Sequence, residues 1–339
     1  MGAEAVANGT PVILIDKMSA HPTEMTIFSL IGATVAFVNI PVIVIIFTSQ
    51  TLKKCKELVL IGGICMVDAL LAMANSVSAM DRLMKFPNGS APNVPQMDCF
   101  FKYYVILFFF ANMLVGISAL LVSLERFVAV FFPLQYLLSY SRTKGIFIML
   151  GSVFFCFVAL FAAFISQNSV PNVEISAMCY TAYIYPPNMA SFLVSVRIGT
   201  LGVSILLYIP ITLRICHMKF RSRKNVIFTS SNHSSTHRLA FRTLTDQKKN
   251  IKFTVTIGKI SSLGNAPNRG ISGLTCLSTL VFLFVPDLII NFNMFGLSSY
   301  HILFYRASLL KAAINLFIYT LRHRELRKEL TLKLCHYHF

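Results

Sequence analysis

Residues 120–136 read LLVSLERFVAVFFPLQY. The run is strongly apolar, and its two ionised side chains, Glu125 and Arg126, are adjacent and stand where the hydrophobicity ends. Ionisable side chains at the edge of a membrane helix tend to pair with one another, so we expect an ion pair at the inner membrane surface. The alternative is that both charges simply extend toward the aqueous interface.

The composition of the whole chain indicates that lipid is its main solvent. Of 339 residues, 55% are hydrophobic and 13% are charged, whereas about a quarter are charged in a typical soluble domain. Apolar windows recur, each close to the roughly 20 residues that a helix needs to cross a bilayer. Lipid-immersed backbone must form its hydrogen bonds within its own segment, which favours helices. The sequence therefore predicts an all-α membrane protein, a bundle of seven transmembrane helices at residues 26–48, 58–80, 101–124, 145–166, 190–213, 274–296 and 300–320.

The positions of lysine and arginine predict the orientation of this bundle. Ten of them lie from Arg214 to Lys252, after the fifth window, and none lies in the loop 167–189. Positive loops stay in the cytosol, so residues 1–25 are expected outside, 26–320 form the bundle, and 321–339 are cytosolic. The net charge of +17 is explained by attraction to anionic lipid, and no nucleic acid partner is expected.

Two cysteines and two glycosylation sequons fall on the expected outer side. Cys99 and Cys179 face an oxidising compartment there and can form a disulfide; the alternative is a pair of free thiols. Asn8 and Asn88 each begin an Asn-X-Ser/Thr sequon and can carry glycans.

Several of these features together resemble the rhodopsin-type G protein-coupled receptors. They are Cys99 at the start of the third helix, Cys179 in the next outer loop, Glu125-Arg126-Phe127 closing the third helix, and Asn315-Leu316-Phe317-Ile318-Tyr319 closing the seventh. Within that superfamily, SLERFVAVFFPLQY, the absence of tryptophan and the ending INLFIYTLRHRELRKEL are most similar to the nematode serpentine chemoreceptors of the class called srsx.

The resemblance implies a chemosensory receptor of the plasma membrane, located in the sensory cilia of neurons. Its partners would be a small hydrophobic ligand, membrane lipid and a heterotrimeric G protein, which outward movement of the sixth helix activates. Glu125, Arg126, Asn315 and Tyr319 would form the switch. No cofactor, metal site or enzymatic activity is expected. The alternatives are a peptide or other small-ligand receptor of the same fold, or a membrane transporter.

The sixth and seventh helices depart from the pattern of the superfamily. The usual Cys-Trp-x-Pro is replaced by Leu283-Phe284-Val285-Pro286, so Phe284 is either the aromatic toggle beside the Pro286 kink or plain packing. Leu316 replaces the usual proline of the closing motif, and the seventh helix is therefore expected to be straighter.

Asp68 lies in the middle of the second window, where an unpaired carboxylate is costly. In the resembled superfamily this residue binds sodium. Here Lys311 lies at a similar depth in the seventh helix, four residues before Asn315. We expect Lys311 to pair with Asp68 and to occupy the sodium position; otherwise the lysine extends to the interface or is neutral.

Candidate ligand contacts lie on the outer halves of the third and seventh helices. Phe109, Asn112 and Met113 belong to a Phe- and Met-rich wall suited to a small apolar molecule, although lipid-facing aromatic residues would give the same pattern. Arg306 either meets an acidic ligand group or pairs with Asp287.

The cytosolic tail repeats leucines with basic residues between them, which predicts an amphipathic helix on the membrane surface. Cys335 near its end is either palmitoylated or a free thiol.

One polar segment, 259–273, interrupts the sixth window. Leu274 to Pro286 spans only about 18 Å of helix, whereas the distance from Lys252 to Pro286 without the segment is about 28 Å. Codons for Gly258-Lys259 and for Ile271-Ser272-Gly273 can contain splice signals. We interpret residues 259–273 as a retained intron; the alternative is a genuine loop insertion.

Overall fold

The structure is a computed structural model that describes residues 22–52, 56, 58–88, 90–169, 173–231, 277–292, 301–322 and 324–336. Within these ranges the chain is almost entirely helical. Five helices are long and apolar enough to cross a membrane, and two further apolar helices, Leu277–Ile290 and Ser308–Thr320, are shorter. The suspected insert 259–273 lies outside the described residues.

The elements follow one another as consecutive helices with one small two-stranded sheet. They are α1 (Pro22–Thr48), α2 (Leu58–Lys85), β1 (Asn93–Pro95), α3 (Gln96–Phe100), α4 (Tyr103–Phe131), α5 (Pro133–Ser139), α6 (Arg142–Asn168), β2 (Glu174–Ser176), α7 (Thr181–Ile184), α8 (Pro187–Ser231), the π-helical segment η3 (Leu280–Phe284), α11 (Val285–Asn291), α12 (His301–Arg322) and α13 (Arg324–His336).

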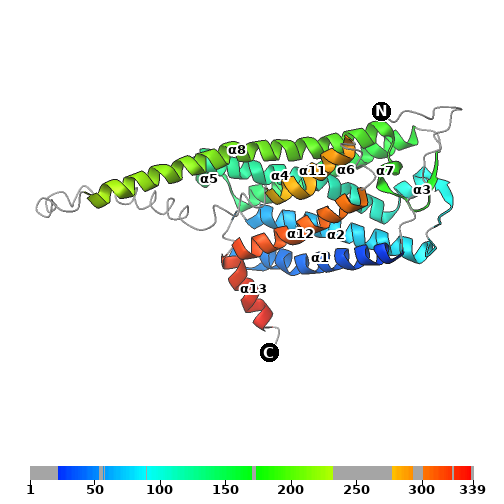
Figure 1. Cartoon of the computed structure of the whole chain (residues 1–339), viewed down its shortest axis with the longest axis horizontal. Coiled ribbons are helices and arrows are strands. Elements are labelled where there is room, and N and C mark those ends of the chain that lie inside the picture. Colours follow the sequence, from blue (N-terminus) through cyan, green and yellow to red (C-terminus); the bar gives the residue numbers. More distant parts are fainter. Residues whose placement is uncertain are drawn as a thin grey trace, which may run out of the picture.

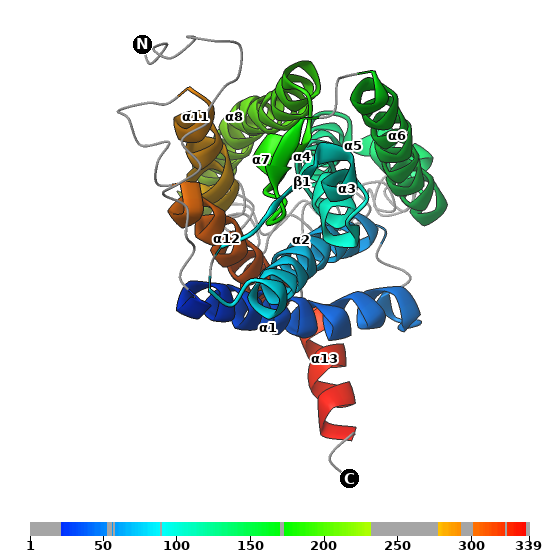
Figure 2. The same ribbon diagram turned by 90° about the vertical axis from the view of Figure 1, so that its right-hand side faces the viewer.

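The long helices form one bundle around α4. Helices α2, α6 and α8 all pack on α4, while α11 and α12 close the side opposite α6 (Figure 2). One end carries a disulfide between Cys99 and Cys179 together with α3 and α7, and we call it the disulfide end. At the opposite end α12 leads into α13, and α8 extends well beyond the bundle (Figure 1); we call this the α13 end.

Helix α6 shows why this bundle suits lipid. Its large residues Phe147, Phe154 and Phe161 are 66%, 70% and 64% exposed. Its buried face consists mainly of small residues, namely Gly145, Ser152, Cys156, Ala159 and Ala163. Small residues between helices and large apolar residues outside are typical of membrane helices, because burial against other helices brings no hydrophobic gain over burial in lipid.

Close packing of α1 on α2 depends on a glycine. A Cβ atom placed on Gly32 would lie 2.6 Å from the carbonyl oxygen of Ala72 in α2. The hydroxyl of Ser76 also donates to the carbonyl of Ser29 at 2.9 Å. The two backbones therefore approach too closely for any larger residue at position 32.

A short sheet and a disulfide cover the disulfide end. Strand β1 pairs antiparallel with β2, with Val94 opposite Ile175. The disulfide then fixes this loop to α3, just before α4, with the Cα atoms of Cys99 and Cys179 5.3 Å apart. From α2, Arg82 donates to the carbonyl oxygens of Met178 and Cys179 at 2.8 and 3.3 Å.

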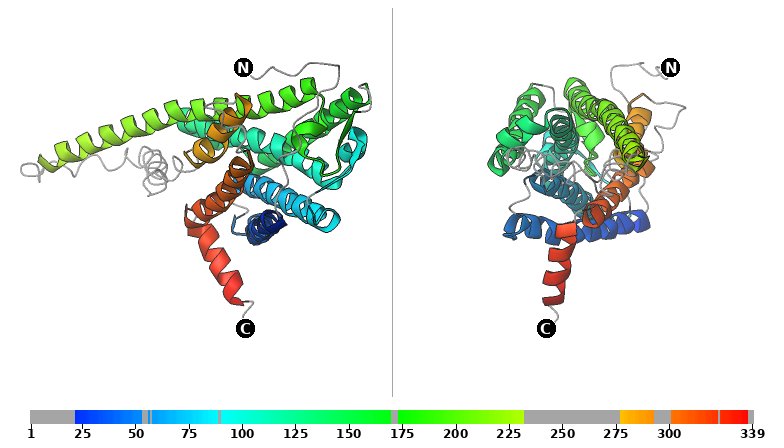
Figure 3. Two further views of the ribbon diagram at one scale, coloured as in Figure 1. Left: turned by 45° about the vertical axis from the view of Figure 1, so that its right-hand side comes forward. Right: turned by 90° about the vertical axis from the view of Figure 1, so that its left-hand side faces the viewer.

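The last helices pack at the α13 end. Helix α12 is continuous from His301 to Arg322, without an internal proline. Leu326 of α13 is fully buried beside Tyr319 of α12 and Ile46 of α1. The remainder of α13 projects away from the bundle (Figure 3).

Candidate functional site

A buried polar network joins three helices in the middle of the bundle. Lys311 Nζ of α12 lies 2.8 Å from Asp68 Oδ1 of α2. Asn315 Nδ2, one helical turn after Lys311, donates to Asp68 Oδ2 at 3.1 Å. Ser278 Oγ in turn donates to Asn315 Oδ1 at 3.1 Å. Both carboxylate oxygens are thus satisfied, and the helix Leu277–Ile290 is tied to the other two.

The burial of this network explains its composition. Asp68 is 1% exposed and Lys311 is 5% exposed. A single charge at this depth costs several kcal/mol, so the two opposite charges need each other. The ammonium group of Lys311 neutralises the carboxylate of Asp68.

A small cavity of about 40 Å³ lies beside the network. It is bordered by Lys311, Asn315 and Tyr319 of α12 and by the paired hydroxyls of Ser123 and Ser204, whose oxygens are 2.6 Å apart. Its volume and polar lining are sufficient for water. Asn315 and Tyr319, which the sequence predicts as switch residues, therefore border the same polar space.

Glu125 and Arg126 lie near the α13 end of α4. Arg126 Nε is 3.6 Å from Glu125 Oε2, and the side chains are 14% and 3% exposed. The hydroxyl of Tyr136, in α5, donates to Glu125 Oε1 at 2.5 Å. This carboxylate therefore accepts a hydrogen bond from Tyr136 at Oε1 and has a guanidinium at ion-pair distance from Oε2.

Lys56 contacts the helix that carries Tyr136. Its Nζ donates to the carbonyl oxygens of Tyr136 and Tyr140, each at 3.0 Å, and lies 4.4 Å from the centroid of the Tyr136 ring. A cation at the last carbonyls of a short helix stabilises it. Neither Lys56 nor Tyr136 was among the predicted site residues, although Tyr136 is the last residue of the stretch 120–136.

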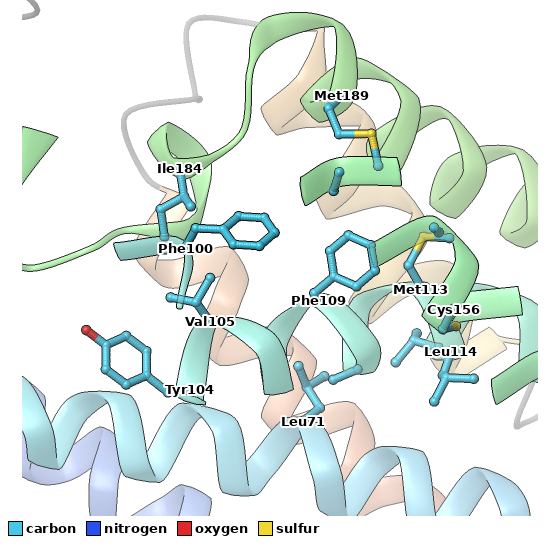
Figure 4. Close-up of a cluster of buried hydrophobic side chains, with 14 of the residues drawn as sticks. Leu71, Phe100, Tyr104, Val105, Phe109, Met113, Leu114, Cys156, Ile184 and Met189 are labelled. Carbon is cyan, nitrogen blue, oxygen red and sulfur yellow. The ribbon is translucent and has the colours of Figure 1, made fainter. Parts of the chain in front are cut away.

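A second, larger cavity of about 260 Å³ lies toward the disulfide end, between α4, α8 and α11. Phe109, Asn112 and Met113 of α4 border it, as does Tyr185 before α8. Figure 4 shows Phe109 and Met113 on α4, with Met189 on a facing turn of α8. Burial raises the pKa of Tyr185, so its phenol stays neutral and can donate a hydrogen bond.

One ion pair crosses this cavity from α8 to α11. Arg197 Nε lies 2.7 Å from Asp287 Oδ2, and both side chains are 16% exposed. Arg197 Nη1 also donates a very short hydrogen bond to Asn112 Oδ1 of α4. The guanidinium therefore joins three helices at the larger cavity.

Comparison with known families bears on the first half of the bundle. Residues 18–183 match the family described as Serpentine type 7TM GPCR chemoreceptor Srbc. The match ends before α8 and so covers slightly less than half of the chain. No curated protein matches the chain.

The Srbc match includes four of the five long apolar helices, both disulfide cysteines, Asp68 and the pair Glu125 and Arg126. Together with the five apolar helices, the match supports a multi-pass membrane protein whose first half is similar to the serpentine chemoreceptors. It names Srbc and does not confirm the srsx class.

Some of the other predicted site residues lie in the described part of the structure and some lie outside it. Phe284 is half-buried in η3 and faces Gly202 of α8, and Pro286 is buried at the start of α11. Asn88 is exposed. Asn8 and the side chains of Arg306 and Cys335 lie outside the described part of the structure. Asp287 pairs with Arg197. Arg197 was not predicted as a site residue, although it is the only charged residue in the sequence window 190–213. A single charge in an apolar window is the signal by which it could have been recognised.

No group of three or more histidine, cysteine or acidic side chains is positioned to hold a metal ion within the described ranges.

Proposed function

We propose that the protein is a chemosensory G protein-coupled receptor. The observation that carries this proposal is the buried Glu125, held by Arg126 and Tyr136 at the α13 end of α4, in a chain whose first half matches a chemoreceptor family. The pair Glu125 and Arg126 can stabilise an inactive state. While Arg126 contacts Glu125 it cannot contact a G protein.

In this proposal the disulfide end faces outward and the α13 end faces the cytosol. A small ligand enters the 260 Å³ cavity and favours a second packing of the helices, a population shift between two states. The helix that contains Ser278 and Asp287 moves outward, Arg126 leaves Glu125, and a heterotrimeric G protein binds. Asn315 and Tyr319 then repack into the small polar cavity.

Lys311 takes the position that sodium holds in the resembled superfamily. The support is its contact with Asp68, which leaves the carboxylate no unpaired oxygen for a metal ion. Resting-state stability would thus come from the chain itself and would not depend on external sodium.

The proposal is tested by expressing the chain, with and without residues 259–273, in cells that contain a promiscuous G protein. A panel of volatile and soluble odorants is then applied. We expect a ligand-dependent G protein response. Solute uptake without G protein activation would contradict the proposal and favour a transporter, and a response only to peptides would favour a peptide receptor.

A further inference from the structure

We infer that the larger cavity binds a small apolar molecule with one carboxylate, which replaces Asp287 as the partner of Arg197. This inference rests on the proposed function, since it names the ligand class of the same receptor. It is carried by the arrangement of Arg197, Asp287 and Asn112.

The pairing of Arg197 with Asp287 is close but poorly directed. Nε and Oδ2 are 2.7 Å apart, yet neither atom has a well-aligned hydrogen bond among the described residues. A guanidinium offers five N–H donors in one plane and is best matched by two carboxylate oxygens in that plane. Asp287 is fixed to α11, and its Oδ2 approaches Arg197 at Nε. A free carboxylate can take the better geometry.

The two partners of this ion pair are held unequally. Arg197 stays anchored by Asn112 of α4 when Asp287 leaves. An amine ligand would instead have to separate Arg197 from Asp287 and leave a guanidinium facing an apolar cavity, which is costly. Arg197 can therefore stay in place while the carboxylate of a ligand replaces that of Asp287.

The rest of the cavity favours a small molecule with an apolar body. Its walls include Phe109, Met113, Leu193 and Ile290. Its volume of about 260 Å³ lies just below the ~300–1,000 Å³ that drug-sized ligands occupy. A monocarboxylic acid with a short hydrocarbon chain or a single ring fits both properties.

The exchange also explains how binding would move a helix. Asp287, released from Arg197, becomes a largely buried carboxylate without a cation, and α11 can relieve this cost by moving toward water. The same helix carries Ser278, which binds Asn315 in the central network. Between the two residues lies the π-helical segment η3, a feature that often marks a movable part of a helix.

The test uses membranes from cells expressing the full chain, with a panel of straight, branched and aromatic monocarboxylic acids. Each acid is compared with its primary amide and with the amine of equal length. We expect saturable binding of at least one acid and binding at least about tenfold weaker for its amide, because the charged hydrogen bonds are lost. Equal binding of acid and amide, preference for the amine, or no acid bound would each overturn the inference.

Substitutions of Asp287 and of Arg197 should change acid binding in opposite directions. Asp287→Asn removes the competing carboxylate, so acids should bind about tenfold more tightly. Arg197→Gln removes the cation, so acid binding should be lost, and Arg197→Lys should restore part of it. Loss of acid binding in Asp287→Asn, or full acid binding in Arg197→Gln, would overturn the inference.

Folding and coupling are followed separately from binding. Surface labelling of an epitope tag shows whether each variant reaches the membrane, and if one does not, the comparison of acid, amide and amine on the unmodified chain decides alone. G protein activation by Glu125→Gln without ligand reports on the proposed function. A chain that signals in this way but binds no acid disproves only the inference, whereas acid binding without any signalling disproves the receptor function.

Discussion

Single residues of opposite charge pair with one another inside the bundle. Asp68 and Lys311 lie 2.8 Å apart with almost no exposure, and this contact follows from the depth of each residue in its helix. The pairing of Arg197 with Asp287 could not be obtained in this way. From its depth in the membrane, Arg306 was a candidate partner of Asp287. Arg197 lies in the cavity because of the rotation of α8 about its axis, which the sequence does not reveal.

Exchanging the two central charges tests their pairing. Asp68→Asn or Lys311→Met alone leaves a buried charge without its partner, which costs about 3–5 kcal/mol, so both single variants should lose most surface expression. The double variant Asp68→Lys with Lys311→Asp, and the neutral double variant Asp68→Asn with Lys311→Met, should recover it. Flow cytometry of a tagged receptor measures this, and failure of both double variants would show that the two residues act independently.

The hydrogen bond from Tyr136 to Glu125 predicts a second effect. Tyr136→Phe removes a hydrogen bond to the Glu125 carboxylate and so makes it easier for Glu125 to release Arg126. Ligand-independent G protein activation should rise severalfold at equal surface expression. The matched control is Tyr140→Phe, which leaves the Tyr136–Glu125 bond in place and should keep the basal signal. Equal signals from both variants would count against a role for this hydrogen bond.

At the scale of elements, hydropathy located the helices better than it located their ends. The window 58–80 corresponds to α2, which continues to Lys85, and the window 190–213 corresponds to α8, which continues to Ser231. Hydropathy detects the part of a helix that lipid surrounds, and it cannot detect polar turns that continue the helix into water. The cover formed by β1, β2 and α7 was not predicted, because strands of three residues leave no periodic signal.

The contact of α1 with α2 predicts a position-specific effect of one methyl group. Gly32→Ala places a Cβ 2.6 Å from a backbone oxygen of α2, so the two helices must separate. Overpacking of this kind typically lowers the free energy of unfolding by about 1–3 kcal/mol. The melting temperature of the detergent-solubilised receptor should therefore fall. Gly151→Ala in α6 has open space around it and serves as control. Equal thermal stability of the two variants would show that α1 does not pack on α2 in this way.

At the scale of the whole molecule, three polar sites follow one another along the bundle. Arg197 and Asp287 lie at the larger cavity, Asp68 and Lys311 lie at the centre, and Glu125 and Arg126 lie at the α13 end. The helix from Leu277 to Asn291 contacts the first two sites through Asp287 and Ser278. Charges within apolar runs of the sequence predicted the pair Asp68 and Lys311 and the pair Glu125 and Arg126. The connection between the sites was not predictable, since it arises from helix packing.

The central claim is that Glu125 holds a signalling receptor in its resting state. The most direct measurement is the ligand-independent G protein activation of Glu125→Gln at matched surface expression, with Glu174→Gln in the exposed strand β2 as control. Losing about 1–1.4 kcal/mol of resting-state stabilisation raises a small active fraction roughly five- to tenfold, so we expect a rise of that size in Glu125→Gln and none in Glu174→Gln. An unchanged basal signal in Glu125→Gln would contradict the account.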